Sequence, residues 1–234
     1  MSRPLGVGET PPLIVAIDGP SGAGKSTVAR ALAARLGVPY IDTGAMYRAI
    51  GLAAKERGIR LPVTDPEKVA AIAEGARLEL ATSPEGSRVL LDGRDVSAEI
   101  RQPEISLYAS AVSAIPGVRR ILVREQQRLG RSRGGVMEGR DIATRVFPET
   151  PHRFFLTASA EVRARRRTRE LAERGTPEPY EKVLGEMEKR DRDDASRADS
   201  PLTCDDRYTL VDSSDRPVEE VVAEIEKNVR KHAI

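Results

Sequence analysis

The chain has 234 residues, of which 32% are charged and 39% are hydrophobic, and its formal net charge is +2. This length suits one large domain, and the near balance of charge argues against a protein that coats nucleic acid through bulk positive charge. The single cysteine, Cys204, excludes an internal disulfide framework and a four-cysteine zinc module, and two histidines leave little for a His-based metal site.

The first part of the chain alternates between strand and helix patterns. Residues 1–12 show no periodic pattern, and we expect them to form a flexible tail. Short apolar runs predict buried strands at Leu13–Ile17 and Pro39–Ile41, while apolar residues at helical spacing predict helices at Thr27–Leu36 and Ala45–Arg57. Such alternation indicates an α/β domain in which helices flank a parallel sheet.

The middle of the chain has a different pattern. A predicted helix at Asp65–Gly75 is followed by two short strand patterns, Arg77–Ala81 and Val89–Leu91, and by the tight-turn pair Asp92-Gly93. We therefore predict a small antiparallel insert over about residues 77–101.

The remainder of the chain returns to the α/β pattern. We expect helices at Glu104–Gln127 (interrupted at Pro116-Gly117), Ala160–Arg174, Tyr180–Arg192 and Pro217–Lys231, and strands at Gly135–Met137, His152–Leu156 and Tyr208–Asp212. The last helix is amphipathic, as expected of a helix that packs on a sheet.

A glycine-rich stretch joins the first predicted strand to the first predicted helix. Its eight residues match the phosphate-loop pattern G-x-x-x-x-G-K-[ST]: Gly19, Pro20, Ser21, Gly22, Ala23, Gly24, Lys25 and Ser26. Glycines let backbone N–H groups turn toward phosphate oxygens, and the helix that follows adds the positive end of its dipole. The pattern predicts a nucleoside triphosphate site in which Lys25 contacts the β- and γ-phosphates and Ser26 is a ligand of Mg²⁺.

Two later polar segments also follow predicted strands, so we expect them at the same edge of the sheet as the phosphate loop. The first is Asp42–Arg48, in which Arg48 is placed to grip a second phosphate. The second is Glu138–Asp141, in which an arginine and an aspartate are neighbours. Each has a simpler interpretation, a helix cap for the first segment and a surface ion pair for the second.

Arginine outnumbers lysine by 31 to 7, and two segments concentrate it. The predicted helix Ala160–Arg174 carries five arginines within seven positions, and the run Arg190–Arg197 contains three arginines and three aspartates. Because like charges one helical turn apart repel each other, we expect a bound polyanion to relieve this repulsion. The alternatives are a solvated charged face, a nucleic-acid contact and, for most of the arginines, a GC-rich genome or a heat-adapted source.

Taken together, these segments resemble the bacterial cytidylate kinases. The resemblance rests on the phosphate loop through Thr27, on Asp42–Arg48, on Gly139–Asp141, on Lys189–Arg197 and on the end of the insert, Asp92–Arg101. It extends over nearly the whole chain. The insert is absent from most other nucleoside monophosphate kinases, which disfavours an adenylate, uridylate or shikimate kinase.

The resemblance implies transfer of the γ-phosphate of ATP to CMP or dCMP, with Mg²⁺ as cofactor. It implies the P-loop NTPase fold, with a parallel-sheet core formed by residues 13–58, 120–160 and 200–234. A CMP-binding region that includes the insert is expected at about residues 59–119, and a short helical lid at about residues 161–199.

The resemblance also implies roles for individual residues. ATP is expected at Gly19–Thr27, and CMP at Thr43, Tyr47, Arg48, Ser110, Arg119, Arg140, Asp141, Arg190, Asp194 and Arg197. Within this set, Arg48, Arg140 and Arg197 are expected to hold the CMP phosphate, Ser110, Arg119 and Asp141 to read the cytosine, and Asp194 with Arg190 to hold the ribose. Lys25, Arg140, Arg197, Arg163 and Arg167 are expected to assist phosphoryl transfer, the last two from the lid. Thr43 stands where family members often have serine, and it keeps the hydroxyl.

The partners expected from the sequence are small molecules. Aromatic residues make up only 3% of the chain, too few for a surface that stacks bases, and no apolar run reaches membrane-spanning length. We therefore expect a soluble, cytoplasmic monomer that binds neither nucleic acid nor a membrane. The alternative from another class is a binding module that uses ATP as a switch without phosphorylating an acceptor.

Overall fold

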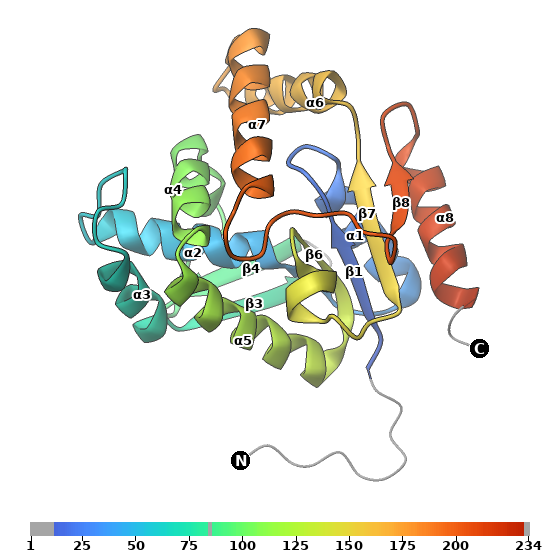
Figure 1. Ribbon diagram of the computed structural model, residues 1–234, viewed down its shortest axis with the longest axis horizontal. Helices are drawn as coiled ribbons and strands as arrows, with labels where there is room; N and C mark the ends of the chain where they lie inside the picture. The colour runs from blue at the N-terminus through green and yellow to red at the C-terminus, as the bar shows by residue number, and fades with distance from the viewer. Residues whose placement is uncertain (1–11, 84–85, 232–234) are drawn as a thin grey trace.

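The computed structural model describes residues 12–83 and 86–231, and its centre is a sheet of five parallel strands (Figure 1). The strand order is β2-β6-β1-β7-β8. These strands are β1 (Ile14–Asp18), β2 (Tyr40–Asp42), β6 (Gly135–Gly139), β7 (His152–Thr157) and β8 (Thr209–Asp212). The predicted parallel sheet is confirmed, with strand ends shifted by one or two residues. The predicted tail lies outside the described residues, except for Pro12.

Both faces of the sheet are covered at β1, which explains why all five of its residues are buried. On β1, Val15 and Ile17 belong to the cluster that includes α1 (Lys25–Leu36) and α8 (Val218–Lys231). Ile14 and Ala16 alternate with them and pack on the opposite face against α5 (Pro116–Arg133). The alternation follows from the two-residue period of a strand.

A second unit extends from one side of the core sheet (Figure 1). It combines four helices around one apolar cluster, namely α2 (Thr43–Glu56), α3 (Pro66–Gly75), α4 (Pro103–Ser113) and the start of α5. Strands β3 (Leu78–Ser83), β4 (Gly86–Leu91) and β5 (Arg94–Asp95) form an antiparallel sheet, and the 3₁₀ turn Glu99–Arg101 follows. The predicted antiparallel insert is confirmed, including its turn at Asp92 (φ 53°) and Gly93 (φ 83°).

Helix starts follow local capping rules. The carboxylate of Asp42 accepts a hydrogen bond from the backbone N–H of Ala45, so α2 begins at Thr43, two residues before its predicted start. Proline opens α5, because its fixed φ suits the first turn of a helix. The predicted break at Pro116-Gly117 was therefore placed slightly too late, since Pro116 is the first residue of the new helix. The five-residue π-helical turn Ile142–Val146 was not predicted.

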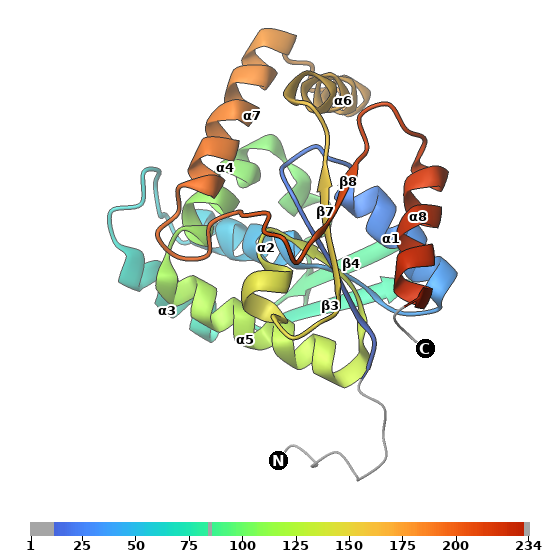
Figure 2. The ribbon, with the colours of Figure 1, turned by 45° about the vertical axis from the view of Figure 1, so that its right-hand side comes forward.

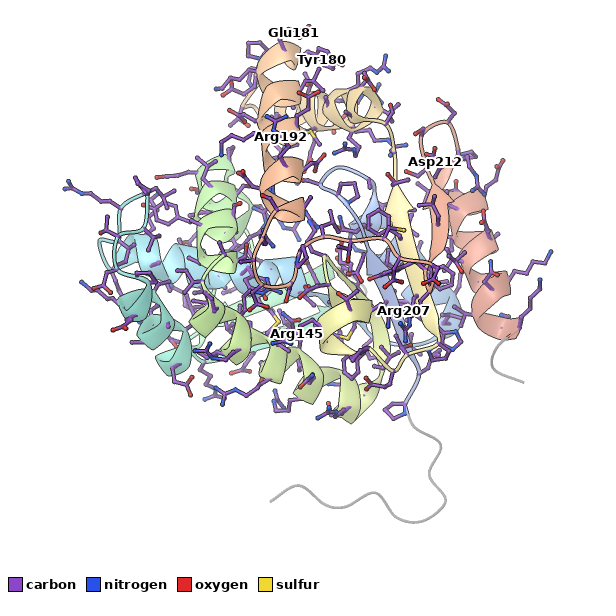
Figure 3. All side chains as sticks on the ribbon, viewed as in Figure 1. Arg145, Tyr180, Glu181, Arg192, Arg207 and Asp212 are labelled. Atoms are coloured by element: carbon purple, nitrogen blue, oxygen red, sulfur yellow. The ribbon has the colours of Figure 1, made fainter. Side chains whose placement is uncertain are left out.

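Two helices, α6 (Ala160–Glu173) and α7 (Tyr180–Ala195), stand above the end of β7 (Figure 2). They pack through a small apolar cluster of Ala164, Leu171, Val183 and Met187. Helix α7 begins at its outer tip, where Tyr180 lies, and descends past Arg192 toward the carboxyl ends of the strands (Figure 3). Within residues 12–83 and 86–231, no helix has both the length and the hydrophobicity of a membrane span.

Candidate active site

The phosphate loop lies at the carboxyl end of β1 and opens α1, as its pattern predicted. Gly22 (φ 77°) and Gly24 (φ 87°) adopt backbone conformations that favour glycine. Gly19 (φ 146°) is required for a second reason, because a Cβ there would lie 2.0 Å from the carbonyl oxygen of Leu156 on β7. The loop therefore has the glycines needed for its backbone to turn toward an anion.

Lys25 is the first residue of α1, and its side chain is only 6% exposed. Its ammonium group donates a hydrogen bond of 2.7 Å to the carbonyl oxygen of Pro20 within the loop. Burial, followed by the charges of Arg140 and Arg190, lowers the pKa of Lys25 to about 7, while Glu138 and Asp18 oppose the shift. Desolvation and nearby cations both penalise the ammonium charge, so the site is arranged to receive an anion.

Ser26 and Glu138 form a second polar group beside the phosphate loop. Glu138, on β6, is buried and accepts a hydrogen bond from the hydroxyl of Tyr40. The Ser26 hydroxyl lies near both side chains and acts to lower the pKa of each. Burial and the charge of Asp42 raise the pKa of Glu138, while Lys25 opposes the shift. Glu138 was not predicted to be a site residue. The sequence could have indicated it, because Glu138 directly follows a predicted strand and polar residues at strand ends were the reason for selecting Arg140 and Asp141.

Three of the predicted acceptor residues, Arg140, Arg190 and Arg197, lie around one carboxylate. Asp194, near the end of α7, is fully buried and accepts hydrogen bonds from Nε of Arg140 (2.9 Å) and from Arg197. Burial acts to raise the pKa of Asp194, but Arg140, Arg197 and Arg190 outweigh it, and the pKa lies below its usual value. In this structure Asp194 therefore neutralises arginines.

The same region holds further arginines, whose positive charge exceeds what Asp194 can neutralise. Burial and the neighbouring arginines lower the pKa of Arg190 to about 10, and its Nε has no hydrogen-bond partner among the described residues. Arg48, on α2, donates to the carbonyl oxygen of Ile100 (3.1 Å) and to Ser106 Oγ (2.9 Å). Burial lowers its pKa, as do the charges of Arg167 and Arg140. A bound phosphate would supply the missing negative charge.

A second buried pair joins α5 to the loop after β6. Arg119 is 3% exposed and forms an ion pair with Asp141, while its Nη1 donates to the carbonyl oxygen of Ser113 (3.2 Å). The guanidinium of Arg119 also lies over the ring of Tyr47, 5.7 Å from its centroid. Burial raises the pKa of Asp141, with Arg119 and Arg197 opposing the shift. The structure thus brings together three of the residues predicted to surround CMP.

Two other predicted acceptor residues form hydrogen bonds within the chain, Thr43 through its hydroxyl and Ser110 through its backbone carbonyl. The Thr43 hydroxyl donates a hydrogen bond of 2.7 Å to the carbonyl oxygen of Glu138, which ties the start of α2 to β6. Ser110 is half-buried on α4, and its carbonyl oxygen accepts a hydrogen bond of 2.8 Å from the Ser113 hydroxyl. The cap at the start of α2 is supplied by Asp42, so the simpler interpretation of this segment holds for that residue.

Two arginines of α6, Arg163 and Arg167, have carboxylate partners within the chain. Arg163 is buried and donates to Asp191 (2.6 Å) on α7 and to the carbonyl oxygen of Ser21 (3.2 Å) in the phosphate loop. Arg167 pairs with Glu170 (2.8 Å). Two carboxylates of the chain therefore lie beside these arginines and reduce their mutual repulsion, while their contact with a bound polyanion stays a prediction.

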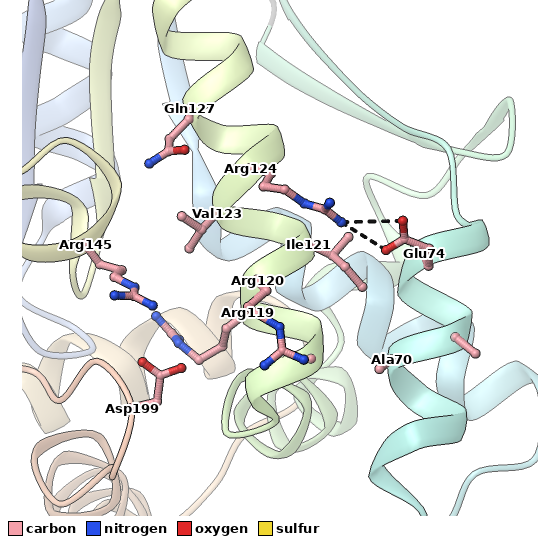
Figure 4. Close-up of a pocket in the computed structure, with 12 residues that line it drawn as sticks. Ala70, Glu74, Arg119, Arg120, Ile121, Val123, Arg124, Gln127, Arg145 and Asp199 are labelled. Atoms are coloured by element: carbon pink, nitrogen blue, oxygen red, sulfur yellow. Dashed lines mark hydrogen bonds and ion pairs between the residues drawn. The ribbon is translucent and has the colours of Figure 1, made fainter.

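A groove of about 670 Å³ lies between α3 and α5, and Arg119 is one of the residues that line it (Figure 4). An ion pair between Arg124 and Glu74 (3.1 Å) closes one side, and Arg145 and Asp199 lie at the other end (Figure 4). Arg119 is shared between this groove and the pair with Asp141. Among the described residues, the lining of the groove includes Arg119 and no residue of the phosphate loop. The groove therefore borders the acceptor residues and does not reach the donor loop.

Comparisons with known proteins agree with this geometry. A family model described as cytidylate kinase matches residues 15–231. A cytidylate kinase of Caldanaerobacter subterraneus subsp. tengcongensis is 50% identical over 218 residues, which cover 93% of this chain and 95% of that protein. A cytidylate kinase of Rhodococcus jostii is 46% identical over 217 residues, covering 92% of this chain and 94% of that protein.

The fold has a counterpart among solved structures. An uncharacterized protein from Eubacterium ventriosum overlays with a TM-score of 0.52 at 13% identity, and the overlay covers 93% of this chain and 98% of that one. At this identity the overlay shows a shared fold and no more. The family match and the two relatives confirm the resemblance found in the sequence: the chain belongs to the cytidylate kinase family.

Proposed function

We propose that this protein transfers the γ-phosphate of ATP to CMP or dCMP, giving ADP and CDP or dCDP. The observation that carries the proposal is the position of two anion-binding groups at one edge of the sheet. The phosphate loop follows β1, and the arginines around Asp194 lie beside the end of the neighbouring strand β6. One group suits the triphosphate donor and the other suits the acceptor phosphate.

The reaction does not need a strong general base in the protein. A nucleoside monophosphate carries an ionised phosphate whose oxygen attacks the γ-phosphorus, so the main tasks are alignment and charge neutralisation. Lys25 is placed to neutralise the transferring group, and Arg48, Arg140 and Arg197 to hold the acceptor phosphate. No histidine is required, and neither of the two histidines belongs to a site segment.

Asp141 is the group we assign to recognition of the base. A carboxylate accepts a hydrogen bond from the exocyclic amino group of cytosine, whereas uracil presents an oxygen there. Arg119 and Tyr47 hold the carboxylate in a buried setting. Leaving a buried polar group unpaired is costly, which gives a physical basis for preferring CMP over UMP.

The residues beside the phosphate loop suit Mg²⁺. This ion is usually bound through one or two protein oxygen ligands together with substrate phosphates, and Ser26 and Glu138 offer a hydroxyl and a carboxylate side by side. Among the described residues there is no cluster of three or more His, Cys, Asp and Glu side chains, as an all-protein metal site would need. When bound, Mg²⁺ would neutralise charge on the donor phosphates.

The remaining assignments concern the larger parts of the molecule. We propose that residues 161–199, which include α6 and α7, act as a lid that excludes water, with Arg163 and Arg167 approaching the ATP phosphates on closure. We assign residues 59–119 to CMP binding, with Arg190 and Asp194 near the ribose. The protein is proposed to act as a cytoplasmic monomer, and light scattering after size-exclusion chromatography tests its mass in solution.

The proposed activity can be tested by measuring ADP release with CMP, dCMP, UMP and AMP as acceptors. We expect CMP and dCMP to be turned over with kcat/KM at least about tenfold above UMP and AMP, since one mispaired polar contact costs that much or more. Faster turnover of AMP than of CMP would contradict the acceptor assignment. ATP binding without any phosphorylated acceptor would favour a nucleotide-dependent binding module.

A further inference from the structure

The carboxylate of Asp18 lies outside the assignments above, although it is fully buried at the end of β1. It accepts three hydrogen bonds. The backbone N–H groups of Ile142 and Ala143 donate at 2.9 Å each, one to each carboxylate oxygen, and the Tyr208 hydroxyl donates at 2.8 Å. All three donors are far from Asp18 in the sequence.

The two backbone donors open the π-helical turn Ile142–Val146, which directly follows Arg140 and Asp141. The first N–H groups of a helical turn have no partner within the turn, and a negative charge at that end is favourable. Asp141, the residue that precedes the turn, makes no side-chain cap within the described part of the chain. Asp18 therefore supplies from another strand the cap that the local sequence lacks.

The same carboxylate is covalently next to the phosphate loop, because Gly19 is the following residue. One side chain thus joins the base of the donor loop to the segment that carries the acceptor residues. The acceptor segment is also closely packed within itself, since a Cβ on Gly139 would lie 2.8 Å from Cδ1 of Ile142. A loop held this tightly has little freedom to shift Arg140 or Asp141.

The setting is costly for a carboxylate. Burial raises the pKa of Asp18 to about 6, and Asp141 adds like charge, while the three hydrogen bonds oppose the shift. The charged groups that face it include Lys25 from α1 and Asp141 from the acceptor loop, and Tyr208 approaches from the start of β8. An apolar residue would avoid the cost of burial but would leave two N–H groups unpaired.

We propose that Asp18 is a positioning residue, which holds the segment Arg140–Ala143 in register with the phosphate loop so that acceptor and donor are aligned. The inference rests on the proposed kinase function. It assigns to Asp18 the alignment of two substrates, and no contact with either. Because misplacement of a reacting group by about 1 Å is worth up to about 100-fold in rate, a lost cap can have a large effect at the acceptor site.

The test compares Asp18→Asn with two other variants by steady-state kinetics. The amide that replaces the carboxylate has only one oxygen and cannot accept at both positions, so one N–H of the turn loses its partner. We expect the KM for CMP to rise about tenfold and the preference for CMP over UMP to fall, with the KM for ATP within about twofold. Tyr208→Phe removes one of the three donors and leaves the backbone pair intact, so it is expected to raise the KM for CMP by less than about threefold.

A matched control separates positioning from loss of stability. Val222→Ala truncates a buried side chain of α8, on the sheet face away from the acceptor loop, and should lower the melting temperature while leaving acceptor preference unchanged. An unchanged KM for CMP and unchanged preference in Asp18→Asn would overturn the proposal. An equal rise in the KM values for ATP and CMP would also overturn it, because it would mean that Asp18 supports the phosphate loop alone.

Amide hydrogen exchange tests the inference independently of catalysis. In Asp18→Asn, exchange at Ile142 and Ala143 should accelerate at least about tenfold, while Val15 and Met137 in the sheet keep the parent's rates. Unchanged exchange at Ile142 and Ala143 would overturn the proposal. If the parent protein does not phosphorylate CMP, the proposed function fails, but this exchange measurement still decides whether Asp18 holds the turn.

Discussion

Nε of Arg140, in the loop after β6, donates a hydrogen bond of 2.9 Å to the carboxylate of Asp194, near the end of α7. The contact links the proposed acceptor site to the proposed lid. Asp194 is fully buried and also accepts a hydrogen bond from Arg197, so one carboxylate orients two of the arginines assigned to the acceptor phosphate. The acceptor site and the end of the lid are thereby parts of one charged cluster.

Replacing Asp194 by asparagine should destabilise the free protein. The change leaves Arg140 and Arg197 without their anion, and breaking a buried ion pair typically costs about 3–5 kcal/mol. Urea unfolding measures the loss, and added CMP should recover part of it by supplying a phosphate. Asp193→Asn is the control, because Asp193 is exposed and forms a surface pair with Lys189, so it should stay within about 1 kcal/mol of the parent. Equal stability of the two variants would contradict this account of the cluster.

Replacing Asp141 by alanine should alter acceptor choice more than donor binding. The variant loses the carboxylate assigned to the cytosine amino group, and it leaves Arg119 buried without its partner. We expect the ratio of kcat/KM for CMP over UMP to fall at least about tenfold, with the KM for ATP nearly unchanged. Competition assays with both acceptors measure the ratio directly. The same ratio in variant and parent would rule out the assignment of Asp141 to base recognition.

Replacing Lys25 by alanine should separate rate from stability. Removal of the cation assigned to the transferring phosphoryl group is expected to lower kcat by about 100-fold or more. Stability should not fall in parallel, because burial already penalises the ammonium group and lowers its pKa to about 7. Lys182→Ala, at an exposed pair with Glu178, should change neither property. An unchanged kcat in Lys25→Ala would contradict the donor-site assignment.

Replacing Gly19 by alanine should be far more harmful than the same change at Gly37. Both positions have positive φ, but a Cβ at Gly37 meets no described atom within 4 Å, whereas at Gly19 it would lie 2.0 Å from the Leu156 carbonyl oxygen. We expect Gly37→Ala to cost about 1–2 kcal/mol for its backbone conformation alone. Gly19→Ala should exceed that cost in denaturant unfolding and should abolish ATP binding. Similar unfolding free energies for Gly19→Ala and Gly37→Ala would contradict this prediction, because they would mean that β1 and β7 can separate at Gly19 at little cost.

The pKa of Asp18 predicts a pH dependence of stability. Because burial raises this pKa from its usual 3.8 to about 6 in the folded state, the folded protein binds the proton more tightly than the unfolded chain does. Its contribution is therefore fully present below pH 3.8 and is lost as the pH rises through about 6, a change of about 3 kcal/mol. Asp18→Asn removes this titration. The free energy of unfolding of the parent should therefore fall relative to that of the variant between about pH 4 and 8. Parallel urea titrations across this range measure it, and a constant difference would contradict the shift.

The phosphate loop could be predicted from the sequence because its parts are neighbours in the chain. The spacing of Gly19, Gly24 and Lys25 specifies a turn into a helix whatever surrounds it, and the apolar run of β1 specifies the strand before it. The insert could be predicted for the same reason, from a tight turn at Asp92-Gly93. The acceptor residues came from the resemblance to a family, and the structure brings Arg140, Asp194 and Arg197 into contact.

The sequence by itself determined the α/β class, the donor loop and the family, because local spacing and strand–helix alternation depend on residues close in the chain. Only the tertiary structure decided the partners of the charged residues. Asp18 meets Ile142, and Arg163 meets Asp191, across separations that no periodic pattern encodes. The side chains of a mixed charged run can face solvent, a ligand or another helix, and the sequence does not distinguish these. The packing of α7 against α6 decides which carboxylates lie beside which arginines. For the same reason, the structure assigned carboxylates of the chain to arginines for which the sequence had suggested a bound polyanion.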